Sequence, residues 1–306
     1  MSQTPQITRG SWLMIATLGL VWGATFLITE VALRGISPFW LAAGRITFAT
    51  ALMGVVWRLR GFRLFTLPTS AGTKTSVMIV GVFSSAVPFC LLAWGQQFVT
   101  AGFAGVSMAA IALIVLPLAY FFVPGEQLGP RRVVGFLLGF AGVVVLIGSD
   151  AFENTGAALE IQGRLACLGA ASCYAMSSVL VRRLPPVDPL GLATILLVVG
   201  MVAVVPIAWV VEGPPSLPSK QTIAILAVLG LIPTAAANLL RIMVIRSAGP
   251  VFMSLTNYQV PVWSVLMGAL ILNEPLPSSL LLALVLILCG VGLSQYSALK
   301  RLFGGR

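Results

Sequence analysis

The sequence predicts an all-α integral membrane protein with ten transmembrane helices, arranged as two five-helix halves that cross the membrane in opposite senses. Three observations support this prediction: the composition, the number of long apolar runs, and a short phrase that occurs twice. Of the 306 residues, 58% are hydrophobic and only 8% are charged. A soluble domain carries about 25% charged residues. Lipid must therefore be the solvent for most of this chain.

The apolar runs have the length that membrane helices require. A helix needs about 20 predominantly apolar residues to cross the hydrocarbon core. Ten runs meet or approach this length: residues 12–33, 38–57, 77–99, 103–123, 133–148, 164–181, 189–211, 222–245, 250–272 and 279–298. The first run has no obvious small-residue cleavage site before the next one, so we expect a membrane span there and no cleavable signal peptide.

Basic residues predict the orientation of these spans. When the loops are assigned alternately to two sides, the side that holds both termini receives most of the lysines and arginines. The opposite side receives only Arg34, Arg164 and Lys220. Because cytoplasmic loops are enriched in basic residues, we expect both termini in the cytoplasm. The net charge of +10 then reports membrane orientation, and we expect no nucleic-acid partner.

A repeated phrase divides the chain in two. "PGEQLGPRR" contains Glu126 and "LNEPLPSSL" contains Glu274, and each copy separates the last two apolar runs of its half. We expect a first half at residues 1–150 and a second at 151–306. Five runs per half is an odd number, so the second half must enter the membrane inverted, as in many secondary transporters. Only the first copy carries two arginines, which fits its predicted cytoplasmic side.

The residue types argue against several other functions. The chain contains no histidine, and its four cysteines lie inside apolar runs without paired spacing. This pattern disfavours a disulfide framework and a zinc site. No nucleophile has a base beside it, so a membrane enzyme is disfavoured, and no loop is long enough for a receptor domain. We expect no cofactor and no metal.

Polar and aromatic side chains within the runs are the candidates for a binding site, because carriers of this design bind substrate near the bilayer midplane. The cavity candidates are Trp22, Thr25, Thr29, Trp94, Gln96, Tyr174, Ser177, Asn238, Asn257 and Tyr258. The first three share one helical face. The last two precede Pro261, whose missing N–H leaves a carbonyl unpaired. The alternative for each is a structural role in packing or hydrogen bonding between helices.

Two charged residues lie inside neighbouring runs. Glu30 is near the outer end of the first run, and Arg45 is about two turns inside the second. In a functional interpretation, Arg45 holds a substrate carboxylate and Glu30 takes a proton or an ammonium group, and both residues are gating candidates. In a structural interpretation they pair with each other, or Arg45 reaches the headgroups. The shallow positions favour the structural interpretation.

Further motifs resemble a known family. "VWGATF" in the first run, "SPFWLAAGRITFA" at the start of the second and the two glutamate junctions are similar to the EamA family of the drug/metabolite transporter superfamily. The resemblance covers nearly the whole chain. It implies ten spans in two inverted halves and a place in the bacterial inner membrane. In general appearance the chain is most similar to bacterial exporters of aromatic amino acids.

We therefore expect a carrier that exports small neutral solutes, including aromatic amino acids, by alternating access through a central cavity between the halves. Its partners would be the substrate and the lipid bilayer. Because one chain holds both halves, a monomer can be complete. Facilitated diffusion is favoured over coupling through Glu30, since the chain lacks a histidine relay. The alternative is a multidrug or other metabolite exporter of the same superfamily.

Overall fold

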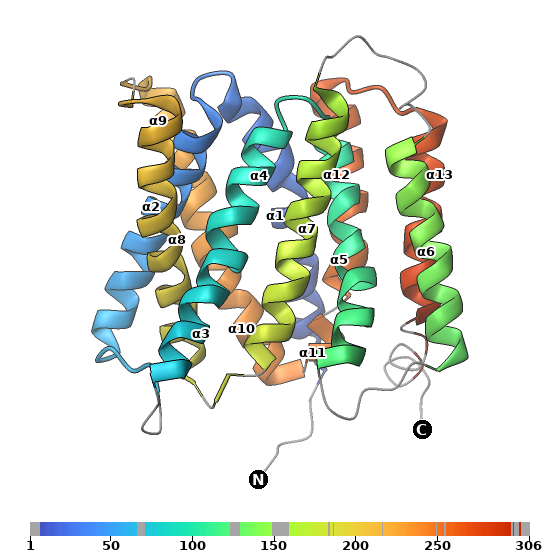
Figure 1. Cartoon of the computed structure of the whole chain (residues 1–306), viewed down its shortest axis with the longest axis horizontal. Coiled ribbons are helices and arrows are strands. Elements are labelled where there is room, and N and C mark those ends of the chain that lie inside the picture. Colours follow the sequence, from blue (N-terminus) through green and yellow to red (C-terminus); the bar gives the residue numbers. More distant parts are fainter. Residues whose placement is uncertain are drawn as a thin grey trace.

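A computed structural model describes residues 7–65, 71–122, 129–148, 159–182, 184–185, 187–215, 217–248, 250–253, 255–294, 296 and 300. These residues form a bundle of helices that run roughly parallel to one axis (Figure 1). The described part of the chain contains no β pairing beyond one isolated antiparallel bridge, between Phe65 and Val187. The prediction of an all-α protein is confirmed.

Each predicted run contains a helix. In the first half the elements are α1 Arg9–Leu33, α2 Pro38–Leu59, α3 Ala71–Gly81, the π-helical segment η1 Val82–Ala86, α4 Val87–Gly95, α5 Ala101–Phe122 and α6 Pro130–Gly148. In the second half they are α7 Glu160–Arg182, α8 Pro189–Glu212, α9 Lys220–Leu229, the π-helical segment η2 Gly230–Ala236, α10 Ala237–Ala248, α11 Pro250–Met253, α12 Thr256–Leu272 and α13 Ser278–Ser294. Among the described residues, six helical stretches are long and apolar enough to cross a membrane, and two apolar helices are shorter.

Local sequence explains where several helices begin. The hydroxyls of Thr8 and Ser11 form a reciprocal capping box at the start of α1. Asp188 accepts a hydrogen bond from the N–H of Gly191 at the start of α8, where Pro189 occupies the first helical position. Such side chains satisfy N–H groups that have no intrahelical acceptor.

The outer surface of the bundle is apolar, as lipid requires. Large hydrophobic side chains remain exposed on α5, α8 and α12, including Phe121 at 75%, Val210 at 83% and Leu270 at 79%. In water, an apolar surface this extensive would mark an interaction site or promote aggregation. Together with the helix lengths it makes the chain a multi-pass membrane protein.

The most extensive helix packing joins the two halves: α6 with α13, α5 with α12, α1 with α12, α2 with α8, α5 with α7 and α4 with α7. Glycine permits the closest approaches. A Cβ atom at Gly23 would lie 2.5 Å from Cβ of Trp263, so α1 can contact α12 only without a side chain there. A Cβ atom at Gly290 of α13 would overlap the backbone of α6 at Gly139.

The two π-helical segments occupy corresponding positions in the two halves. η1 begins at Val82 and η2 at Gly230, and the spacing between these residues equals that between Glu126 and Glu274. A π-helical turn widens the helix and disturbs its hydrogen-bond ladder, and it is frequent at functional sites. Glu126 itself lies outside the described residues. Irregular backbone at membrane depth is tolerated where it is buried in protein or faces a cavity.

Candidate functional site

The best-defined polar cluster of the bundle interior forms where α2 meets η2. Nε of Arg45 donates a hydrogen bond of 2.7 Å to Oγ1 of Thr234. The Thr234 hydroxyl in turn donates to the carbonyl of Leu229, at 2.8 Å. The Arg45 guanidinium lies over the Phe89 ring of α4, 4.4 Å from its centroid, and interacts electrostatically with Tyr174 of α7. One arginine thus contacts two other elements and interacts electrostatically with a third.

Two more of the predicted candidates hydrogen-bond to carbonyl groups of η2. Nε1 of Trp22 on α1 donates to the Pro233 carbonyl at 3.1 Å. The side-chain amide of Asn238 donates to the Thr234 carbonyl. Trp22, Arg45 and Asn238, which are far apart in the sequence, therefore converge on one irregular stretch of backbone. Trp22, Asn238 and Arg45 are all half-buried.

The structure does not bring Glu30 and Arg45 together. Arg45 forms no ion pair within the described residues, and its hydrogen-bond partner is Thr234. Glu30 of α1 instead lies beside Glu274, the residue that caps the start of α5. The Glu274 carboxylate accepts hydrogen bonds from the N–H groups of Ala101, at 2.7 Å, and of Gly102, at 3.0 Å. Oε2 of Glu30 is buried and has no hydrogen-bond partner among the described residues.

Trp94 and Gln96 lie at the C-terminal end of α4. Gln96 is buried, and its side-chain amide donates to the Phe26 carbonyl of α1 at 2.9 Å. This bond holds α4 against α1. Trp94 is half-buried and packs edge to face with Phe98, with 5.0 Å between the ring centroids. This bond is the interhelical hydrogen bonding that the sequence analysis gave as the alternative to a cavity role for Gln96.

The remaining candidates differ in whether their polar groups are paired. Thr25 donates to the Val21 carbonyl of its own helix, and Ser177 donates to the carbonyl of Tyr174. The hydroxyls of Thr29 and Tyr258, by contrast, are buried and have no hydrogen-bond partner in the described part of the chain. Asn257, next to Tyr258, is half-buried.

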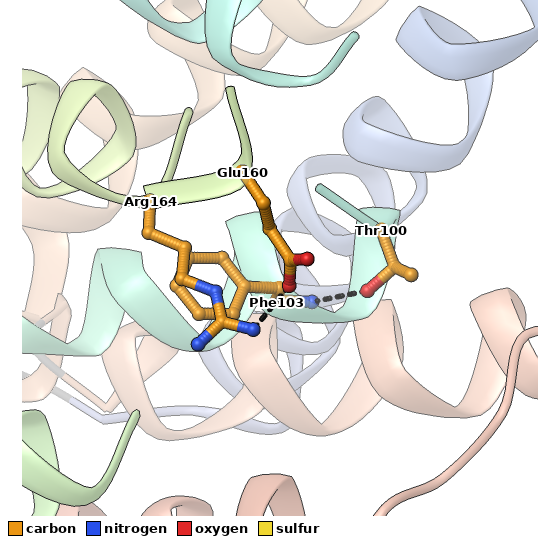
Figure 2. Close-up of polar contacts among 4 residues, drawn as sticks. All are labelled: Thr100, Phe103, Glu160 and Arg164. Carbon is orange, nitrogen blue, oxygen red and sulfur yellow. Dashed lines mark hydrogen bonds and ion pairs between the residues drawn. The ribbon is translucent and has the colours of Figure 1, made fainter. Parts of the chain in front are cut away.

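An ion pair on α7 contacts α5 through an aromatic ring. Figure 2 shows the Glu160 carboxylate of α7 paired with the Arg164 guanidinium, whose central carbon lies 5.5 Å from the centre of the Phe103 ring. The N–H of Phe103 donates to Oγ1 of Thr100 at 3.1 Å. Arg164 is 4% exposed, so this basic residue is held by an ion pair and an aromatic ring within the protein.

Sequence reasoning missed Thr234, Phe89 and Glu212. The first two carry no signal of their own, because a threonine and a phenylalanine are ordinary residues of an apolar run. Glu212 accepts hydrogen bonds from Ser37 and from the backbone at the start of α2. Its position at the end of a run was the available clue. Within the described residues, no group of three His, Cys, Asp or Glu side chains is placed to hold a metal ion.

Comparison with known proteins gives a consistent result for both halves. The profile of the EamA-like transporter family matches residues 10–148 and again residues 161–295. The uncharacterized transporter YoaV of Bacillus subtilis is 21% identical over 289 residues, which cover 94% of this chain and 97% of YoaV. The uncharacterized transporter YvbV of the same organism is 24% identical over 293 residues, which cover 95% of this chain and 92% of YvbV.

Two further comparisons agree with these. Protein PagO of Salmonella typhimurium is 23% identical over 164 residues, or 54% of this chain and 52% of PagO. A solved crystal structure has a TM-score of 0.64 at 22% identity, covering 94% of this chain and 98% of that one. At this identity the likeness concerns the fold alone. The two profile matches, which together span most of the sequence, show that the chain belongs to the EamA-like transporter family.

Proposed function

We propose that this membrane transporter exports small neutral solutes, amino acids including aromatic ones, by alternating access through a central cavity between its two halves. The observation that carries the proposal is the convergence of Trp22, Arg45 and Asn238 on η2. Trp22 and Arg45 belong to the first half, whereas Asn238 and η2 belong to the second. A binding site of a few polar and aromatic groups in an apolar bundle suits small, partly hydrophobic solutes.

The proposal includes two inverted halves, residues 1–150 and 151–306. Equivalent elements support this. η1 and η2 begin at corresponding positions, and α1 pairs with α12 of the other half as α7 pairs with α5. Carriers of this design bind substrate where the repeats meet. The cavity candidates named from the sequence remain part of the proposal, with the η2 cluster at its centre.

We place the protein in the bacterial inner membrane with both termini in the cytoplasm. Among the exposed basic residues, Arg58 lies in the last turn of α2, Arg60 and Arg63 follow this helix, and Lys74 lies in the first turn of α3. The chain passes from α2 to α3 at the lower end of the bundle in Figure 1. An excess of lysine and arginine is characteristic of the cytoplasmic side.

Flux measurements on the purified protein test the proposal. Proteoliposomes loaded with radiolabelled phenylalanine or leucine should lose label faster than protein-free liposomes, and the two amino acids should compete. A facilitative carrier should show the same efflux with and without an imposed pH gradient. Transport of a cationic drug without transport of either amino acid would refute the substrate assignment and support the multidrug alternative.

A further inference from the structure

Arg45 is a cation inside the bundle whose hydrogen-bonding capacity is only partly used. Its Nε is fixed by Thr234 at 2.7 Å, and its guanidinium lies over Phe89. Nη1 and Nη2, the two terminal nitrogens, make no hydrogen bond to a described residue, and neither is among the buried polar atoms that lack a partner. A guanidinium offers a planar fork of donors that matches a carboxylate. The outer part of this fork is available to a ligand.

No acidic side chain of the described chain supplies the missing counter-charge. Glu30 lies beside Glu274, Glu160 pairs with Arg164, Asp188 caps α8, Glu212 caps α2 and Glu274 caps α5. The other three acidic residues of the chain, Glu126, Asp150 and Glu153, lie outside the described residues, in the predicted loops between apolar runs. A charge at membrane depth is costly and marks a functional site unless it is paired.

The contacts of Arg45 hold the fork in a defined position. The hydroxyl of Thr234 is itself oriented, because it donates to the Leu229 carbonyl across η2. Phe89 covers one face of the guanidinium at 4.4 Å, a cation–π geometry. A side chain fixed at Nε and on one face loses less conformational entropy when it binds a ligand. These contacts explain how a lone arginine is kept in place between ligand-binding events.

We propose that the guanidinium of Arg45 binds the carboxylate of the transported solute, so that the substrate itself is the counter-ion. This inference rests on the proposed function and adds its recognition rule: a transported solute must carry a carboxylate. Tyr174 and Trp22 pack against the apolar core with part of their surface exposed, and in this proposal the apolar part of the solute lies beside them. Because Arg45 lies in the first half and Thr234 in the second, the bound carboxylate sits where the halves meet.

Three related probes test the rule in proteoliposomes. Phenylalanine carries both charged groups, 3-phenylpropionate only the carboxylate, and 2-phenylethylamine only the ammonium group. Because a transported solute must carry a carboxylate, the wild type should not transport 2-phenylethylamine. Arg45→Gln should slow phenylalanine flux about 10- to 100-fold, the range expected for loss of hydrogen bonds to a charged group. Arg45→Lys should recover part of the flux, since an ammonium keeps the charge but lacks the fork.

Arg58→Gln provides the matched control, because Arg58 is an exposed arginine in the last turn of the same helix. It should leave every flux unchanged. Thr234→Val removes the acceptor of the Arg45 Nε bond, and Thr234→Ser retains it. If Arg45→Gln fails to fold, this second pair decides the matter: only the valine variant should lose phenylalanine flux, by about 3- to 10-fold.

The outcomes separate this inference from the proposed function. If the wild type transports phenylalanine and the Arg45 and Thr234 variants do so equally well, the carboxylate site is wrong and the exporter stands. If the wild type transports 3-phenylpropionate but no amino acid, and Arg45→Gln abolishes that flux, the amino-acid assignment is wrong and the carboxylate site stands. Wild-type flux of 2-phenylethylamine alone would overturn both.

Discussion

Glu212 joins the two halves at one end of the bundle, and its removal should loosen that end. It is the last residue of α8. Its carboxylate accepts hydrogen bonds from the Ser37 hydroxyl at 2.6 Å and from the N–H groups of Phe39 and Trp40, both at 3.0 Å. These donors lie at the start of α2, where N–H groups have no intrahelical acceptor. Glu274 does the same for α5.

The structure sets the size of the effect of Glu212→Ala. Hydrogen bonds to a charged group contribute about 1.5–3 kcal/mol each, and the negative charge at a helix N-terminus adds about 0.3–1 kcal/mol. Glu212 is half-buried, so water can replace much of the lost acceptor. The net cost is then closer to two capping interactions, about 2–3 kcal/mol. Glu212→Gln keeps one acceptor oxygen and should cost about 1 kcal/mol.

Thermal unfolding in detergent can be followed with a thiol-reactive dye, because Cys90, Cys167 and Cys173 are free and buried. At about 2 °C per kcal/mol for a chain of this size, Glu212→Ala should lower the midpoint by about 4–6 °C. Lys220→Gln is the control, since Lys220 is an exposed residue at the start of α9 at the same end. A midpoint for Glu212→Ala within about 1 °C of wild type, or an equal loss in the control, would refute the reasoning.

Three further predictions concern packing, the site and orientation. Gly290→Ala should destabilise the protein by about 1–3 kcal/mol, because the new methyl group overlaps the α6 backbone and overpacking costs this much. Gly292→Ala, with open space around it in the same helix, should leave the unfolding midpoint equal to or slightly above that of the wild type. Trp22→Phe removes the donor to the η2 carbonyl. It should slow phenylalanine flux about 5-fold, the equivalent of about 1 kcal/mol. Unchanged flux would place Trp22 outside the site. In intact cells, a membrane-impermeant maleimide should label Lys220→Cys but label Lys74→Cys only after permeabilisation, and the reverse pattern would invert the proposed topology.

The helices could be predicted from the sequence because length and apolarity decide them in a membrane. Within lipid every backbone polar group must be satisfied inside the chain, so a long apolar run becomes a helix wherever it occurs. The run predicted at 38–57 is the helix Pro38–Leu59, and that at 189–211 is Pro189–Glu212. The π-helical segments could not be predicted this way, since η1 and η2 lie inside continuous apolar runs and length and apolarity do not distinguish a π-helical turn from an α-helical one.

The site could be predicted only in part, and the reason is geometric. Trp22 and Asn238 stand out as polar or aromatic side chains inside apolar runs, and both do reach η2. Their acceptors are backbone carbonyls, which have no signature in the sequence. The pairing of Arg45 with Thr234 depends on how α2 is rotated against η2. Nearness in sequence suggested Glu30 as a partner, but its carboxyl lies beside Glu274.

The repeated phrase combines two physical requirements, membrane topology and helix capping, and the structure shows the capping at Glu274 separately. In the proposed topology the arginines after Glu126 lie on the cytoplasmic side and the serines after Glu274 on the opposite side, which is the distribution that the excess of basic residues in cytoplasmic loops predicts. The glutamate has a different role, which is to cap a helix. The Glu274 carboxylate accepts hydrogen bonds from the first N–H groups of α5. A helix N-terminus favours an anion on either side of a membrane. A phrase can therefore keep its glutamate and lose its arginines, because capping depends on the helix and topology depends on the side.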